Sequence, residues 1–178
     1  IPRRLAVSRD GHGSGRAVGV DITPAMLNGG NRAIRAGNLS ATAFLVGGSG
    51  MELPFAPQVF DVAVCAFGTH HMDAPRLLRE TRRVLRPGGR LVLAEAGAPS
   101  YWRTVAGRLV LKVMLSAFGL TQSRSRNQIE EDAFRQMHTA AEWRAMLSNA
   151  GFGAIQVREL RARRAWYPRA LTMYAEVA

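Results

Sequence analysis

The sequence is short of cysteine and of long apolar runs. Its single cysteine, Cys65, excludes an internal disulfide, and no metal-ligand spacing is present, so we expect no bound metal. No apolar run reaches the roughly 20 residues that a helix needs to cross a bilayer, and the start carries no signal-peptide pattern. These absences predict a soluble, cytoplasmic protein without a membrane span.

Lysine is also scarce, because Lys112 is the only one and arginine supplies the other basic residues. The net charge of +11 raises the hypothesis of a nucleic-acid partner. The bias toward arginine, however, is typical of codon usage in a genome rich in G and C. Many arginines stand among apolar residues at helical spacing, as in "RLLRETRRVLR". We interpret them as solvent-facing helix surfaces, which argues against a nucleic-acid partner and leaves RNA as an alternative.

The length of the chain fits one domain. With 178 residues, 47% of them hydrophobic, it can bury a sizeable core, and we expect a single domain over residues 1–178. No internal repeat or low-complexity segment divides it. The first residue is Ile1 rather than methionine, so we expect the sequence to be a piece of a longer protein.

Short β-branched runs alternate with amphipathic stretches, which indicates alternating strands and helices. Strands that are apolar almost throughout and are linked by helices predict a parallel sheet covered on both faces. The last two strands have no helix between them, so we expect them to pair antiparallel. The expected strands are 16–22, 42–47, 59–67, 90–96, 154–160 and 170–177, and the expected helices are about 24–36, 74–85, 100–120 and 140–149.

Residues that favour helix starts precede three of these helices. Thr23 is placed to act as an N-cap before a proline at the first helical position. Asp73 is the expected cap of the next helix, and Thr139 with Glu142 has the spacing of a capping box. The helix after Thr23 is expected to be weakened by Gly29 and Gly30.

Four segments together resemble a known family. They are "VGVDITPAML", "GMELPFAPQVFDVAV", "HHMDAPRLLRETRRVLRPGGRLVLAEA" and "EWRAMLSNAGF". Their order and spacing resemble the class I S-adenosylmethionine-dependent methyltransferases, above all the branch that methylates small molecules such as quinone precursors and natural products. The resemblance runs from about Ile1 to Phe152. It implies an α/β, Rossmann-like fold with a mostly parallel sheet and an antiparallel last strand.

The resemblance also implies where the cofactor, S-adenosylmethionine, binds. Open α/β sheets place ligands at the carboxyl ends of their strands. In the family, the first strand and its glycine-rich turn would lie before Ile1, so we expect both to be missing from this sequence. "GHGSG" (residues 11–15) precedes a strand and is therefore not taken for that turn.

Asp21 is the first predicted cofactor residue, because a carboxylate at a strand end can accept hydrogen bonds from both ribose hydroxyls. A turn or helix-capping aspartate is the alternative, and an acid here would suit NAD equally well. The resemblance places Ile22 and Met26 as apolar cover beside the adenine, with ordinary core packing as the alternative.

Two further segments are implied to line the cofactor. The family usually has an aspartate that accepts from the adenine amino group where this sequence has Ser49. A hydroxyl can still accept that hydrogen bond, but without a charge it contributes less. Gly50 and Met51 would contribute backbone N–H groups and an apolar wall. Ala66 and Phe67, just past a strand, are expected near the sulfonium.

Three residues are candidate catalytic groups. Methyl transfer from an activated donor needs mainly alignment of the reacting atoms, with a general base only if the nucleophile must lose a proton. His70 and His71 follow a strand end and would titrate near neutral pH, although they also fit a role in organising their loop. Glu95 is a further base or substrate anchor, with a structural ion pair as the alternative.

The segment at about 99–138 corresponds to the substrate lid of the family. Tyr101, Trp102, Met114 and Phe118 are therefore candidate substrate contacts. The same apolar face also fits a core position or a homodimer contact. The predicted function is methyl transfer from S-adenosylmethionine to a small molecule. The alternatives are an RNA methyltransferase and a protein of this fold that does not methylate.

Overall fold

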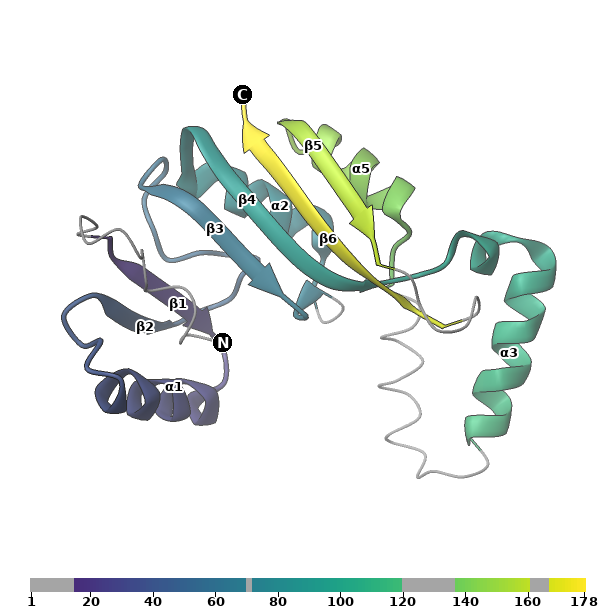
Figure 1. The fold of residues 1–178 in the computed structure, drawn as a ribbon, viewed down its shortest axis with the longest axis horizontal. Coiled ribbons are helices and arrows are strands. Elements are labelled where there is room, and N and C mark those ends of the chain that lie inside the picture. The colour runs from purple at the N-terminus through teal and green to yellow at the C-terminus, as the bar shows by residue number, and fades with distance from the viewer. Residues whose placement is uncertain (1–14, 70–71, 120–136, 161–166) are drawn as a thin grey trace. The chain divides into compact units, whose positions relative to one another are not determined.

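The computed structural model describes residues 15–69, 72–119, 137–160 and 167–178, with side chains for all of these except residues 114–119. Two compact units divide the chain, Ile1–Phe55 and Ala56–Ala178, and each is described by itself. Figure 1 shows the elements of both units.

The first unit contains a two-stranded parallel sheet and one helix. Strand β1 (Ala17–Asp21) pairs with β2 (Ala43–Gly47), and helix α1 (Pro24–Ala36) connects them. Glycine lets the helix pack closely here, because a Cβ on Gly30 would lie 2.5 Å from a methyl carbon of Leu45. This contact explains a glycine that helix propensity alone disfavours.

The start of α1 differs in detail from the prediction. Thr23 occupies the N-cap position and Pro24 the first turn, as expected, but the threonine side chain makes no capping hydrogen bond. Instead, the backbone N–H of Thr23 donates to Oδ1 of Asp21 at 2.7 Å. The fixed φ of Pro24 favours the first helical turn.

The second unit is built on a four-stranded sheet with the order β3-β4-β6-β5. Strand β3 (Phe60–Ala66) is parallel to β4 (Leu85–Gly97). Strand β6 (Arg169–Val177) runs antiparallel to both β4 and β5 (Phe152–Glu159), which confirms the predicted antiparallel pairing of the last two strands. The register sets Leu93 opposite Met173.

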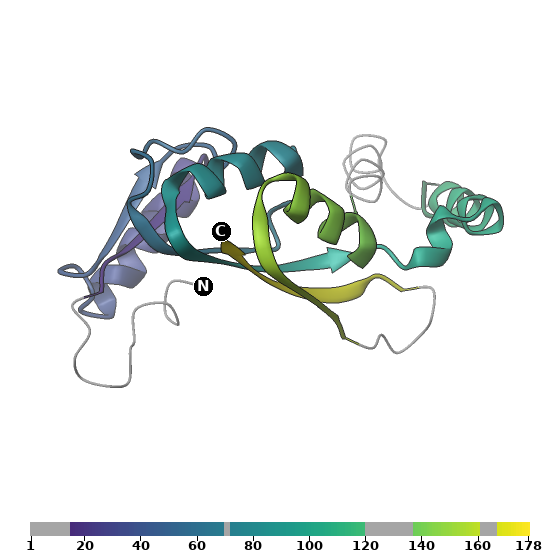
Figure 2. The same cartoon turned by 90° about the horizontal axis from the view of Figure 1, so that it is seen from above.

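Helices α2 (Ala74–Val84) and α5 (Ala140–Asn149) cover one face of this sheet (Figure 2). Asp73 caps α2 by accepting from the Arg76 N–H at 2.8 Å, and the predicted capping box begins α5. Alternate residues of the strands point at these helices and are buried. The core combines Leu78, Trp143 and Leu147 of the helices with Leu91, Leu93, Leu171, Met173 and Ala175 of the strands.

The strand residues between the buried ones point to the opposite face of the sheet. Val62, Val64 and Val92 are exposed there. In the described part of the chain, the expected helical cover of the four-stranded sheet is therefore seen on one face, the face of α2 and α5.

The predicted helix over residues 100–120 is divided in two. A 3₁₀ turn, η3 (Ser100–Arg103), is followed by α3 (Val105–Gly119). Thr104 separates them with extended backbone, and its Oγ1 accepts from the Gly107 N–H at 3.1 Å. Gly107 packs so closely that a Cβ would lie 1.9 Å from the Tyr101 carbonyl oxygen. None of the helices in the described residues is both long enough and apolar enough to span a bilayer.

Candidate functional site

The carboxyl end of β1 brings the first predicted residues together. Asp21 is partly buried, with Oδ1 held by the Thr23 N–H at 2.7 Å. Its backbone oxygen accepts from the Gly48 N–H at 3.1 Å, which ties the following loop to the strand end. Ile22 and Met26, just beyond, are exposed. A fixed carboxylate therefore stands beside two uncovered apolar side chains.

The loop at residues 48–52 is ordered by its own hydrogen bonds. Oγ of Ser49 accepts from the Met51 N–H at 3.1 Å, and the Ser49 carbonyl accepts from the Glu52 N–H at 3.1 Å. A hydroxyl oxygen has two lone pairs, so Ser49 can accept one hydrogen bond in addition to this one. Gly50 lies inside this turn. Ser49, Gly50 and Met51 thus lie in the loop that is bonded to the end of β1.

The carboxyl end of β3 carries unusual backbone. Ala66 ends the strand, and Phe67 follows with φ of 54° and an exposed ring. A bulky residue at positive φ is strained, and such strain is concentrated at functional sites. The Phe67 N–H donates to the Ala94 carbonyl at 2.8 Å, so pairing with β4 holds the strained residue in place.

Glu95 is buried at the carboxyl end of β4, with 2% of its surface exposed. Its Oε2 accepts from the backbone N–H of Thr69 at 2.9 Å and from the Thr69 hydroxyl at 2.6 Å. Its Oε1 accepts from the Ala96 N–H at 3.0 Å. These bonds tie the loop after β3 to β4. They favour an anchoring role for Glu95, while its role as a base stays a prediction.

Thr69 was not among the predicted residues. The only signal in the sequence is a hydroxyl residue directly before the histidine pair. His70 and His71 themselves lie outside the described residues. Nearby, burial and then the negative charge of Glu95 raise the pKa of Cys65 to about 11, so this thiol is neutral at physiological pH.

The predicted lid residues have different surroundings. Trp102 is buried, and its indole N–H donates to the Tyr101 hydroxyl at 2.8 Å. The structure places Met114 and Phe118 in α3, but their side chains lie outside the described ones. The contacts of all four residues with a substrate stay predictions.

A bidentate ion pair joins η3 to α5. Arg103 donates to both carboxylate oxygens of Glu142, at 2.8 and 2.9 Å, and to the Met137 carbonyl at 2.8 Å. The hydrogen bonds from Arg103 lower the pKa of Glu142 to about 2. Burial lowers the pKa of His138, which lies edge-on to the Trp143 ring. These contacts give His138 a structural role.

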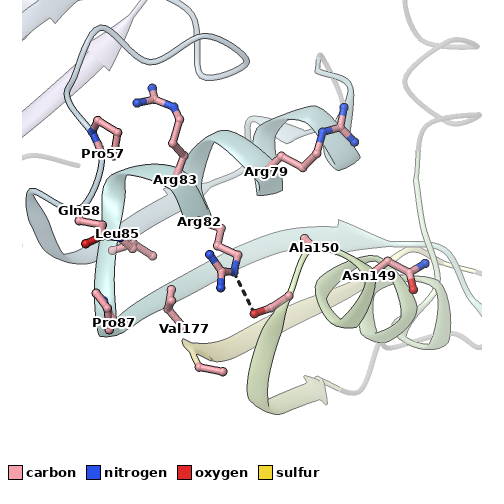
Figure 3. Close-up of a pocket in the computed structure, with 12 residues that line it drawn as sticks. Pro57, Gln58, Arg79, Arg82, Arg83, Leu85, Pro87, Asn149, Ala150 and Val177 are labelled. Carbon is pink, nitrogen blue, oxygen red and sulfur yellow. Dashed lines mark hydrogen bonds between the residues drawn. The ribbon is translucent and has the colours of Figure 1, made fainter.

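A cavity of about 590 Å³ lies at the other end of the four-stranded sheet, where β3 and β4 begin (Figure 3). Two of the arginines at this cavity are already bonded to protein groups. The Arg82 Nε donates to the Gly151 carbonyl at 3.0 Å, and Arg83 pairs with Glu80 at 2.8 Å. The carboxyl ends of α2 and α5 also reach this cavity, and their carbonyl dipoles disfavour anions. None of the predicted site residues lines it.

In the described ranges, no three histidine, cysteine or acidic side chains cluster in a way that would hold an ion.

Solved structures share this fold. Geranyl diphosphate C-methyltransferase from Streptomyces coelicolor A3(2), solved with Mg²⁺, geranyl diphosphate and S-adenosyl-L-homocysteine, superposes with a TM-score of 0.70 over 92% of this chain and 64% of its own, at 15% identity. At that identity the likeness establishes the fold alone. The fold is the Rossmann-like fold of the class I S-adenosylmethionine-dependent methyltransferases.

Sequence comparison identifies the family within that class. The model of the ubiE/COQ5 methyltransferase family matches residues 4–164, so the chain belongs to this family. A relative from Dinoroseobacter shibae, the ubiquinone/menaquinone biosynthesis C-methyltransferase UbiE, is 32% identical over 81% of this chain and 59% of its own length. The demethylmenaquinone methyltransferase of Bacillus velezensis is 29% identical over 83% of this chain and 64% of its own. The chain thus spans about three fifths of the length of these curated relatives.

Proposed function

We propose that the protein transfers a methyl group from S-adenosylmethionine to a carbon atom of a small, quinone-type acceptor. The observation that carries the proposal is the family match over residues 4–164, together with relatives named as quinone C-methyltransferases. Two features of the second unit fit this chemistry, namely the strained Phe67 and the bonded loop at Thr69.

Residues of the first unit fit the adenosine part of the cofactor. Oδ1 of Asp21 is held by a backbone N–H, which fixes the carboxylate for hydrogen bonds from ribose hydroxyls. Ile22 and Met26 offer exposed apolar surface to the adenine, and the Ser49 hydroxyl oxygen can accept a hydrogen bond from the adenine amino group. We assign these residues to cofactor binding, with Gly50 and Met51 in the same loop and Ala66 and Phe67 toward the methionine part.

Bound S-adenosylmethionine supplies a methyl group on a positively charged sulfur, which is already activated for displacement. The protein has to align the acceptor carbon with this methyl group and exclude water. In the transfer, a carbon–carbon bond forms as the methyl–sulfur bond breaks, and the acceptor carbon loses its ring proton. A hydroquinone is a better carbon nucleophile once a ring hydroxyl is deprotonated, and this is the step that would use a base.

We assign that base role to the histidine pair. His70 and His71 directly follow Thr69, whose backbone and hydroxyl are bonded to Glu95. An imidazole titrates near neutral pH and can accept a phenolic proton. In this proposal Glu95 positions the loop and the histidines move the proton. If His70→Ala and His71→Ala both leave turnover intact, the base assignment is wrong.

The test is a methyl-transfer assay with labelled S-adenosylmethionine. Reduced demethylmenaquinone is the first acceptor, and tRNA and rRNA are the comparison. We expect label in the quinone product and none in RNA. Calorimetry with the cofactor should show binding that Asp21→Ala weakens more than tenfold, since a charge-assisted hydrogen bond contributes about 1.5–3 kcal/mol.

Two variants serve as controls for Asp21. Asp21→Asn keeps an oxygen for the Thr23 N–H and removes the charge, so it separates local capping from ribose binding. Asp61→Asn changes an exposed aspartate that pairs with Arg86, and it should leave cofactor binding unchanged. Absence of cofactor binding by the wild type would refute the proposal, whereas binding without transfer to any quinol would refute the acceptor class.

A further inference from the structure

Helix α3 turns an apolar face to solvent. Val105, Leu109 and Val113 are 79%, 64% and 62% exposed. They are spaced four residues apart, so they form one stripe along the helix. Val110 lies beside this stripe and is also exposed. An apolar helix surface of this kind is unusual on a soluble protein unless it contacts something.

The outward direction of this stripe is fixed by the other side of the helix. Gly107 is buried against the Tyr101 carbonyl of η3, the element that directly precedes α3. By helical spacing, Met114 and Phe118 share the side of Gly107, seven and eleven residues further on. The positions predicted to meet a substrate are thus on a different side from the exposed stripe.

The border of the stripe is basic. Arg108 and Lys112 are one helical turn apart and both are exposed. Neither has an ion pair in the part of the chain that the structure describes. The sequence contains no acidic residue between Glu95 and Glu130. An apolar stripe flanked by lysine and arginine is typical of helices that lie in a membrane interface.

We propose that α3 docks on an anionic lipid surface, with Val105, Leu109 and Val113 entering the acyl boundary and Arg108 and Lys112 contacting the headgroups. Long basic side chains at such a border bury their stems and keep their charges in the headgroup layer. A second copy of the chain fits this surface less well, because Arg108 and Lys112 find no acidic residue on the same helix of a partner copy. The net charge of +11 acts in the same direction, by attracting the protein to an anionic surface.

The docking is independent of the proposed methyl transfer. If that function also holds, docking would bring the protein to the bilayer, where quinones with apolar tails dissolve. The lipid-binding experiment uses no cofactor or acceptor, so its failure and a failure of the enzyme assay are distinguishable.

The experiment is flotation of the purified protein with vesicles. Vesicles of phosphatidylcholine are compared with vesicles that also contain phosphatidylglycerol, at low and high salt. We expect binding only to the anionic vesicles and weaker binding at high salt. Each basic residue near an anionic surface strengthens binding about fivefold, so Arg108→Gln with Lys112→Gln should weaken binding by about twenty-five-fold.

Leu109→Gln with Val113→Gln removes the apolar contact and should weaken binding at least about tenfold. Matched controls outside α3 are Arg158→Gln and Leu160→Gln, which change an exposed charge and an exposed leucine of the second unit. Circular-dichroism melting checks that the variants fold, which is expected because the substituted side chains are exposed. Three outcomes would overturn the proposal: no binding to anionic vesicles, equal losses in the control variants, or a wild-type dimer that the α3 variants dissociate.

Discussion

Replacing Thr69 by valine tests the link between the loop after β3 and the end of β4. Valine keeps the branched shape of the side chain and removes only the hydroxyl. The lost bond joins the Thr69 hydroxyl to Oε2 of Glu95 at 2.6 Å, between two buried side chains. A buried hydrogen bond to a charged group contributes about 1.5–3 kcal/mol. We expect the free energy of unfolding to fall by that amount.

The assay is thermal and urea unfolding of wild type, Thr69→Val, Glu95→Gln and the double variant. For a chain of this size, 1 kcal/mol lowers the melting temperature by about 2–4 °C, so Thr69→Val should melt about 3–12 °C lower. Glu95→Gln removes the charge but keeps an oxygen that can accept from the Thr69 hydroxyl, so it weakens the bond that Thr69→Val removes. The double variant should therefore cost less than the sum of the two single variants, by part of the about 1.5–3 kcal/mol that the bond contributes. The control is Thr42→Val, which removes a partly buried hydroxyl whose bond to the Leu39 carbonyl is long, at 3.4 Å.

Two results would refute this reasoning. If Thr69→Val unfolds within about 0.5 kcal/mol of wild type, the hydroxyl bond is not a significant anchor. If Glu95→Gln abolishes turnover without lowering stability, while Thr69→Val changes neither, Glu95 acts on the substrate and does not hold the loop. An anchoring carboxylate predicts instead that both variants lose stability and turnover together.

Two further predictions concern titrating groups. The pKa of Cys65 is raised from 9.0 to about 11, so at pH 8 the thiol should react with a disulfide reagent about a hundredfold more slowly in the folded than in the urea-unfolded protein. Its contribution to the free energy of unfolding should be lost as the pH rises from 9 to 11. Equal reaction rates in the two states would contradict the burial of the thiol. The pKa of Glu142 is lowered from 4.5 to about 2, so its carboxylate stabilises the fold above pH 4.5, and this contribution should be lost as the pH falls toward 2. Arg103→Gln should make the free energy of unfolding less dependent on pH in that range. An unchanged pH dependence would exclude Arg103 as the cause of the lowered pKa.

Much of the fold was predictable because its signals are local. An almost continuous apolar run such as "FDVAVCA" is a local strand signal, and β3 is found within a residue of its expected bounds. The capping box of Thr139 and Glu142 is a four-residue pattern, and it forms as predicted. The break at Thr104 was not predictable, because it depends on contact between Gly107 and the Tyr101 carbonyl, which propensity does not report.

The site was predictable only in part. Asp21 and Phe67 follow apolar runs, and a residue after such a run lies at a strand end, so their positions come from local pattern. The bond between Thr69 and Glu95 joins residues 26 apart in the chain. It exists because β3 and β4 pair in parallel with Ala66 opposite Ala94, and that register is a tertiary property. Sequence alone therefore suggested a catalytic role for Glu95 and missed its partner.

The two ends of the four-stranded sheet differ in a way that indicates which one is functional. At the end where β3 and β4 begin, there is a large cavity, but Arg82 and Arg83 are bonded to protein groups and helix carbonyl ends approach it. At the end where these strands finish, Phe67 has strained backbone and Glu95 is buried, and both conditions cost free energy. A fold retains such costs where they hold reactive groups in place, so the strained end is the better candidate, although the cavity lies at the other end.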